Sequence, residues 1–180
     1  MLTLVMADSQ LEVSPSKIDG DESIPEMIHL PLILAQDSGL AEEKELRTII
    51  HTKEDKVFQY ESDAHVPDSL SKFKKQLIEA SKGGKTPLGI NYYENDLMEI
   101  LDDQFGKKIV MTPKGEKQSP VDLFKRTEDF VVVIGGFNEG DFTSPVYEWA
   151  EKEVSISERL MKPCSVAAEV LVSYRYCSLE

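Results

Sequence analysis

Residues 131–142 read VVVIGGFNEGDF, and this stretch decides the fold class. Its continuous apolar run predicts a strand buried on both faces, as the strands of parallel sheets are. The run ends in the pair Gly135-Gly136, and Gly140 follows. Glycines at the carboxyl end of a strand let backbone amides approach a ligand, and open α/β sheets bind ligands at that edge. The alternative is an ordinary turn, and the spacing departs from the G-x-G-x-x-G dinucleotide fingerprint.

Other apolar runs predict further strands on both sides of this stretch. They lie at residues 2–7, 46–52, 57–60, 108–111 and 153–157. The second and third are separated by a polar turn, residues 53–56, so they read as a hairpin. Residues 28–34 are also apolar, but Pro31 cannot donate a ladder hydrogen bond, so this segment is an edge strand, a bulge or a short helix. Residues 112–115 read as a turn.

Helical patterns alternate with the strands. Asp68-Ser69 supplies an N-cap for a helix that ends in the segment 81–87, another helix is expected near Asn95, and a short one begins at Ser119-Pro120. The C-terminal helix has an apolar core stripe of Val166, Val170, Leu171 and Tyr174. Alternating strands and helices predict an α/β protein with a largely parallel sheet. With 180 residues, the chain reads as a single domain, residues 1–180.

The composition restricts the possible partners. The chain has 20 Lys+Arg against 33 Asp+Glu, which gives a formal net charge of −13. This charge argues against binding nucleic acid through net charge, although a local basic face remains possible. The lysines that gather locally are Lys72, Lys74, Lys75, Lys82 and Lys85, and then Lys107, Lys108, Lys114 and Lys117. They are candidates for phosphate contacts, and the alternative is an ordinary solvated surface.

The chain gives no sign of a membrane, a disulfide framework or a metal site. No apolar run approaches the ~20 residues that span a membrane, and residues 1–10 lack the basic region of a signal peptide. Two cysteines, Cys164 and Cys177, cannot make a disulfide framework, so a cytoplasmic location is expected. The histidines, His29, His51 and His65, lack ligand-like spacing, so no metal is expected. His29 and His51 read as core histidines with satisfied hydrogen bonds, and the alternative for each is that it faces a cleft.

Several segments in order resemble a known family. They are LTLVMADSQLE (2–12), PEMIHLPLILAQDSG (25–39), IIHTKEDKVF (49–58), KKIVMTPKGE (107–116), VVIGGFNEGDF (132–142) and VSISERLMKP (154–163). Together they resemble the archaeal ribosome-biogenesis methyltransferases that methylate N1 of a pseudouridine in small-subunit ribosomal RNA. That family belongs to the SPOUT class of trefoil-knot methyltransferases. The resemblance implies a SPOUT-like sheet flanked by helices, a C-terminal trefoil knot, S-adenosylmethionine as cofactor, and a homodimer.

The resemblance also implies a set of cofactor-binding residues. The knot and the cofactor site would occupy about residues 107–178. The residues implied to bind the cofactor are Thr112, Gly115, Gly135, Gly136, Phe137, Gly140, Ser155, Ile156, Ser157 and Met161. Glycine turns and strand ends of this kind make concave sites lined with backbone amides, which agrees with the reading of the residues alone.

The implied reaction needs a proton acceptor, because N1–H is lost as the nitrogen attacks the sulfonium methyl group. Four acidic residues lie near the ends of predicted elements: Asp8, Glu26, Asp37 and Asp141. Glu26 stands where the family has the aspartate of an Arg-Pro-Asp motif, because the segment here reads Ile24-Pro25-Glu26. Glu26 and Asp141 are therefore the candidate catalytic residues, while caps and surface charges are the alternative for all such carboxylates.

The chain departs from the family on the RNA-binding side. His65 stands where an arginine is usual, the family's Pro-Arg reads Pro67-Asp68, and Glu169 replaces a basic residue of the last helix. The candidate RNA contacts that remain are His65, Lys72 and Lys75. Three explanations stay open: RNA binding in high intracellular salt, a different RNA target, or a diverged relative without the reaction.

Two rival functions are kept beside methyl transfer. One is a non-catalytic ribosome-assembly factor that docks RNA or ribosomal proteins, and the other is an acidic α/β protein with an unrelated small ligand. Ala168 and Val172, four residues apart on the last helix, are candidates for the homodimer interface, or they extend the domain's own core.

Overall fold

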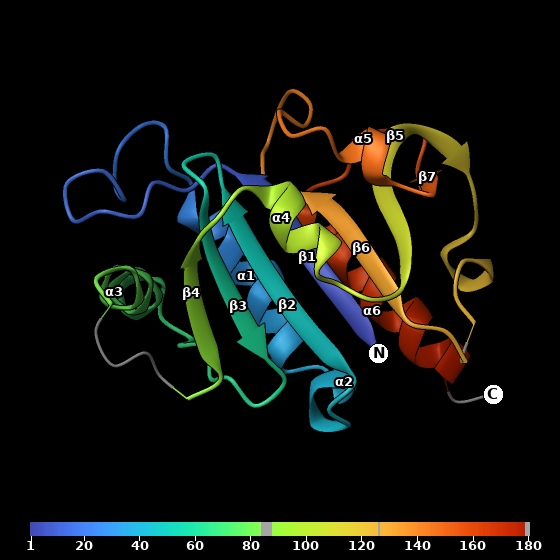
Figure 1. Ribbon diagram of the computed structural model, residues 1–180, viewed down its shortest axis with the longest axis horizontal. Helices are drawn as coiled ribbons and strands as arrows, with labels where there is room; N and C mark the ends of the chain where they lie inside the picture. Colours follow the sequence, from blue (N-terminus) through green and yellow to red (C-terminus); the bar gives the residue numbers. More distant parts are fainter. Residues whose placement is uncertain (84–87, 126, 179–180) are drawn as a thin grey trace.

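The computed structural model describes residues 1–83, 88–125 and 127–178. A seven-stranded sheet in the order β4-β3-β2-β1-β6-β5-β7 forms its centre (Figure 1). The strands are β1 (Leu2–Ser9), β2 (Leu46–Thr52), β3 (Lys56–Glu61), β4 (Ile90–Glu94), β5 (Lys107–Lys117), β6 (Phe130–Gly135) and β7 (Lys152–Ser155). From β2 to β7 every pairing is parallel, whereas β3 and β4 are antiparallel additions at one edge. The predicted α/β class with a largely parallel sheet is confirmed.

Helices cover both faces of the sheet. They are α1 (Pro25–Gln36), α2 (Gly39–Glu42), α3 (Leu70–Ser81), α4 (Leu97–Asp102), the 3₁₀ helix η1 (Pro120–Asp122), α5 (Val146–Trp149) and α6 (Pro163–Ser178). Helices α1 and α6 pack together behind the sheet, α4 crosses its front, and α3 lies beyond the β4 edge (Figure 1). The larger core joins the sheet to α1, α3 and α6, and the smaller one joins it to α4 and α5.

The strongest sequence patterns correspond to observed elements. The hairpin is present as β2 and β3, and the apolar run that begins at Val131 lies in β6. Helix α3 begins after Ser69, whose hydroxyl accepts a hydrogen bond from the Lys72 backbone N–H, as an N-cap does. The predicted end of this helix falls partly on residues 84–87, which lie outside the described residues; the helix itself ends at Ser81.

Two local predictions need correction or completion. The segment around Pro31 is the full helix α1, with Pro25 in its first turn, and burial of Ile28 and Leu32 offsets the hydrogen bond that Pro31 cannot make. The predicted turn at residues 112–115 is wrong, because β5 continues through it. The pairing of β5 with β7 shifts register between Met111 and Glu116, so this segment is an irregularity within a strand. The short elements β4, α2 and α5 were not predicted.

Candidate functional site

A cavity lies where the parallel strands β6 and β7 end and β5 becomes irregular. It has an empty volume of roughly 770 Å³, part of it open to solvent, which is within the usual range for small-molecule sites. Its walls come from β5 at residues 111–114, from the end of β6 and the following loop at 134–142, and from the segment between β7 and α6 at 154–166. The edge of an α/β sheet where strands end is where such folds bind ligands.

Most of the cofactor residues implied by the sequence line this cavity. Those present in its wall are Thr112, Gly135, Phe137, Gly140, Ser155, Ile156, Ser157 and Met161. The wall also contains Lys114, which the sequence offered as a phosphate contact and not as a cofactor residue. Other wall residues were not singled out as ligand-binding, among them Met111, Phe142, Val154, Arg159 and Leu160. The sequence could have indicated these residues, because they are neighbours of the predicted ones in the same three segments. The wall is mostly apolar, with a few hydroxyl and charged groups.

Gly115 and Gly136 are not in the cavity wall, and their role is packing. A Cβ on Gly136 would lie 2.2 Å from the Ser9 Oγ and 2.7 Å from its Cα. A Cβ on Gly115 would lie 2.6 Å from the backbone of Glu153 and Val154. Both contacts are closer than real Cβ atoms approach, so these glycines let strands come together.

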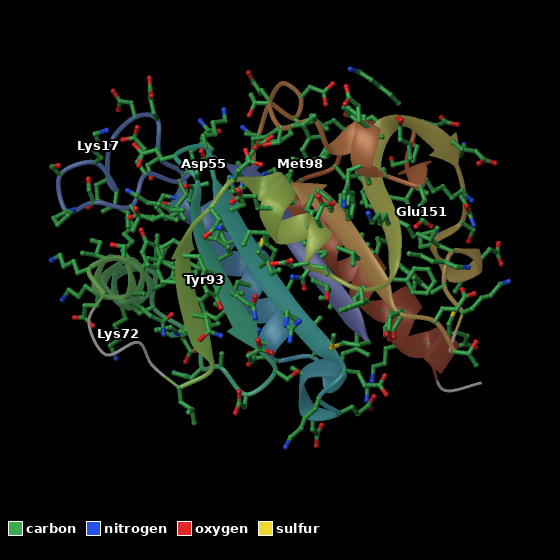
Figure 2. All side chains as sticks on the ribbon, viewed as in Figure 1. Lys17, Asp55, Lys72, Tyr93, Met98 and Glu151 are labelled. Carbon is green, nitrogen blue, oxygen red and sulfur yellow. The ribbon has the colours of Figure 1, made fainter. Side chains whose placement is uncertain are left out.

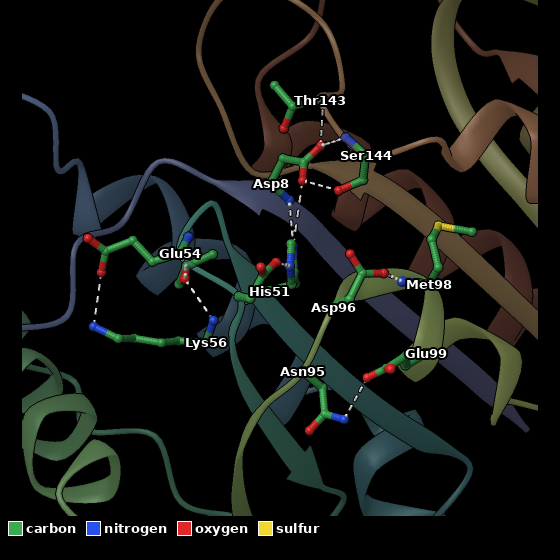
Figure 3. Close-up of polar contacts among 12 residues, drawn as sticks. Asp8, His51, Glu54, Lys56, Asn95, Asp96, Met98, Glu99, Thr143 and Ser144 are labelled. Atoms are coloured by element: carbon green, nitrogen blue, oxygen red, sulfur yellow. Dashed lines mark hydrogen bonds and ion pairs between the residues drawn. The ribbon is translucent and has the colours of Figure 1, made fainter.

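The loop between β6 and α5 is held to the sheet by a buried carboxylate. Asp8 is 1% exposed and lies next to the last residue of β1, with a φ of 49°. It accepts hydrogen bonds from the backbone N–H groups of Thr143 (2.7 Å) and Ser144 (2.9 Å) and from the Ser144 hydroxyl (2.6 Å) (Figure 3). The same figure shows His51 beside Asp8. The His51 Nδ1 is 3.3 Å from the Asp8 backbone nitrogen, and its Nε2 is 3.1 Å from an oxygen of Asp55. Asp8 thus fixes one end of a cavity wall.

A second polar chain lies at the cavity itself. The Nζ of Lys114 is 2.6 Å from the Oδ2 of Asp141, and the Asp141 Oδ1 accepts hydrogen bonds from the Phe142 N–H and the Tyr147 hydroxyl. The Tyr147 oxygen is 3.3 Å from the Thr112 hydroxyl. The hydrogen bond from Lys114, with that from Tyr147, lowers the pKa of Asp141. Partial burial and the hydrogen bond to Asp141 raise the pKa of Tyr147 to about 12.

The two candidate catalytic carboxylates are placed differently. Asp141 lines the cavity, whereas Glu26 does not and lies exposed in the first turn of α1. A carboxylate whose pKa is lowered holds its negative charge firmly and is a weak proton acceptor. The geometry around Asp141 therefore favours positioning over proton transfer.

The candidate RNA contacts lie at the opposite end of the sheet. His65, Lys72 and Lys75 are all exposed, on α3 and on the loop before it, and Figure 2 shows Lys72 pointing away from the body of the protein. Lys74 is paired with Asp19. Within the described ranges neither Lys72 nor Lys75 makes an ion pair. Lys85, the last member of this cluster, lies outside the described residues.

The loop that carries His65 is anchored by His29. The Nε2 of His29 is 2.7 Å from the Pro67 carbonyl oxygen, and its ring stacks on Phe73 of α3 at 4.6 Å between centroids. His29 and His51 are therefore buried histidines with hydrogen-bond partners, as predicted. In the part of the chain that the structure describes, no His, Cys, Asp and Glu side chains gather as a metal site.

The last helix exposes an apolar side. Val172 is 68% exposed and Tyr176, one turn further, is 59% exposed, whereas Ala168 is partly covered. Val172 therefore does not extend the core of its own domain. Across residues 1–83, 88–125 and 127–178, no helix combines the length and apolarity needed to span a membrane.

The parallel sheet covered by helices on both faces, with a largely apolar cavity at the edge where β6 and β7 end, defines an α/β protein with a small-molecule site. The chain belongs to the EMG1/NEP1 methyltransferase family, whose model matches residues 14–175. A curated relative, the ribosomal RNA small subunit methyltransferase Nep1 of Thermoplasma volcanium, is 30% identical over 221 aligned positions that cover 97% of each chain. The Nep1 of Methanothrix thermoacetophila is 25% identical, and the alignment covers 100% of this chain and 98% of that relative.

The crystal structure of Archaeoglobus fulgidus Nep1 bound to S-adenosylhomocysteine has the same fold. The TM-score is 0.79 at 20% sequence identity, with 99% of each chain covered. The alignment with the Thermoplasma relative is longer than the 180 residues of this chain, so that relative carries segments that this chain lacks.

Proposed function

We propose that this protein is an S-adenosylmethionine-dependent methyltransferase of ribosome biogenesis that methylates N1 of a pseudouridine in small-subunit ribosomal RNA. Membership of the EMG1/NEP1 methyltransferase family supports the reaction class. The single observation that carries the proposal is the cavity at the ends of β5, β6 and β7, which gathers eight of the ten implied cofactor residues from three separate segments.

The cavity fits S-adenosylmethionine by size and by chemistry. An apolar wall that includes Val154, Ile156 and Leu160 suits the nucleoside, and the hydroxyl groups of Thr112 and Ser155 supply polar contacts. The cofactor supplies an electrophilic methyl group on a sulfonium sulfur. The residues of this chain hold that group in place and exclude water from it, and such positioning carries much of the catalysis in methyl transfer.

The proton lost from N1 needs an acceptor near the cavity. Asp141 and Glu26 remain the candidates from this chain. Asp141 is in the wall but is neutralised by Lys114, and Glu26 lies outside the wall. We therefore infer that the contribution of this chain rests mainly on positioning, and that neither carboxylate alone accounts for most of the rate.

The proposed partners are the small-subunit ribosomal RNA and a second copy of the chain. His65, Lys72 and Lys75 would contact RNA phosphates, and the exposed side of α6 around Val172 would face the partner subunit. The trefoil knot within about residues 107–178 and a cytoplasmic location belong to the same proposal. Elution as a dimer on gel filtration, with a shift to monomer in Val172→Asp, would support the interface.

The first test is calorimetric titration with S-adenosylmethionine and S-adenosylhomocysteine. Micromolar binding, about −8 kcal/mol, is expected for both. Methyl transfer is then measured on an RNA that contains pseudouridine and on the same RNA with uridine. This comparison tests whether pseudouridine is the target base. No binding to either nucleoside by folded protein would reject the methyltransferase and leave a non-catalytic assembly factor, to be tested against ribosomal proteins.

A further inference from the structure

The cavity wall contains one ion pair among its described residues. Lys114 comes from β5 and Asp141 from the loop after β6, and their charged atoms are 2.6 Å apart. The charged side chain that remains in the wall, Arg159, forms no ion pair with a described residue. Most of the other lining side chains are apolar, so this pair is the most concentrated charge in the site.

Both members of the pair have hydrogen-bonding capacity left for a ligand. The Lys114 ammonium has three donors and gives one to the Oδ2 of Asp141, and its side chain is 73% exposed. The Asp141 carboxylate is fixed in orientation by the Tyr147 hydroxyl and the Phe142 N–H, both on Oδ1. A carboxylate accepts about four hydrogen bonds, so it has room for one more donor. The pair is therefore held in place but incompletely satisfied.

We propose that Lys114 and Asp141 form the subsite for the amino-acid end of the cofactor, an inference that rests on the proposed function. The Lys114 ammonium would bind the α-carboxylate, and the Asp141 carboxylate would bind the α-ammonium group. An amino acid carries its carboxylate and its ammonium group close together. Its negative group can therefore face Lys114 while its positive group faces Asp141. The four charges would then alternate in sign, which makes each hydrogen bond charge-assisted.

This assignment separates the two ends of the ligand. The nucleoside end would contact the apolar wall, and the amino-acid end would contact the ion pair at the solvent-exposed side of the cavity. It also gives Asp141 a role that suits a carboxylate kept ionised by a neighbouring cation. Binding an ammonium group requires the carboxylate to stay ionised, whereas accepting a proton does not.

The test compares two ligands that differ only at the amino-acid end. S-adenosylhomocysteine carries the zwitterion, and 5′-methylthioadenosine has the same nucleoside and thioether without it. Calorimetry with Lys114→Met and with Asp141→Asn should show S-adenosylhomocysteine binding weakened about tenfold, as expected for one charge-assisted hydrogen bond. Binding of 5′-methylthioadenosine should stay within about twofold of the wild type.

A matched pair elsewhere on the same strand serves as control. Lys117 of β5 and Glu158 are also 2.6 Å apart and exposed, but neither lines the cavity. Lys117→Met and Glu158→Gln should leave the ratio of the two affinities unchanged.

The outcomes distinguish the possible failures. Equal weakening of both ligands in Lys114→Met and Asp141→Asn would mean that the pair only shapes the loop, and would overturn the subsite. A selective loss in Arg159→Ala, with Lys114→Met unchanged, would assign the carboxylate to Arg159 and also overturn it. If folded wild-type protein binds neither ligand, the proposed function itself fails and the subsite fails with it.

Discussion

The two ends of the sheet carry the two halves of the proposed function, and they are built in opposite ways. At the β7 end, the cavity is formed by strand ends packed so closely that Gly115 and Gly136 have no room for a Cβ. At the β4 end, the proposed RNA contacts are separate exposed side chains such as Lys72 and Lys75. A site made by close backbone packing tolerates few substitutions, whereas a charged surface can change one residue at a time while the fold is kept. The departures that the resemblance indicates at His65 and Asp68 lie on this exposed surface, in agreement with that difference.

The largest effect is expected where packing is tightest. Gly136→Ala should lower the free energy of unfolding by about 3 kcal/mol, because its Cβ meets the backbone of Ser9. Gly140→Ala is the control: it has a φ of 93° but nothing within 4 Å, so only backbone strain of about 1 kcal/mol is expected. Urea denaturation measures both. Equal losses of stability in the two variants would show that the contact of the Gly136 Cβ with Ser9 adds no cost.

A smaller effect is expected where the loop is tied to the sheet. Asp8→Ala leaves the N–H groups of Thr143 and Ser144 without their acceptor and should cost about 2 kcal/mol of stability. Hydrogen exchange of the amides at residues 137–144 should become faster. Thr143→Ala keeps the backbone hydrogen bond and should behave as the wild type. Unchanged exchange in Asp8→Ala would mean that the loop is held by other contacts.

The RNA end should respond to single charges without loss of fold. Lys72→Glu and Lys75→Glu should each weaken binding to a small-subunit RNA fragment several-fold and reduce the salt dependence by about one phosphate contact. Asp68→Arg should strengthen binding. Lys125→Glu, an exposed lysine on the loop after η1, is the control. If Lys72→Glu, Lys75→Glu and Asp68→Arg all bind RNA as the wild type does, RNA does not contact α3.

The smallest effect concerns pH. Lys114 lowers the pKa of Asp141, so the stabilisation from this pair is present above about pH 4, the range of an unfolded aspartate, and is lost as the pH falls through the lower pKa of the folded state. Asp141→Asn should reduce this loss of stability on acidification by a few tenths of a kcal/mol, since the pair is exposed. Lys114→Met should have the same effect in thermal unfolding below pH 4. If the stability of both variants depends on pH as that of the wild type does, the coupling between Lys114 and Asp141 is contradicted.

Much of the fold follows from sequence patterns because burial imposes them. The apolar run that becomes β6, the hairpin of β2 and β3 and the stripe of α6 each show the period of their element. Helix α1 was ambiguous, since Pro31 removes a hydrogen bond in any element and only packing against the core decides that a helix forms. Residues 112–115 were predicted as a turn because Pro113 and Gly115 are local turn signals. The strand continues through them because Met111 and Glu116 on either side pair with β7, about 40 positions away in the sequence.

The sequence by itself determined the α/β class and the position of the glycine loop. Through the resemblance it also indicated eight of the residues in the cavity wall. Tertiary structure decided which glycines line the cavity and which ones only let backbones approach, because that depends on the strand lying opposite. It also decided that Asp141 is paired with Lys114 and that Asp8 is a buried anchor. Residues distant in sequence meet only when parallel strands bring their ends to one edge of the sheet, and no local pattern records which side chains then come into contact.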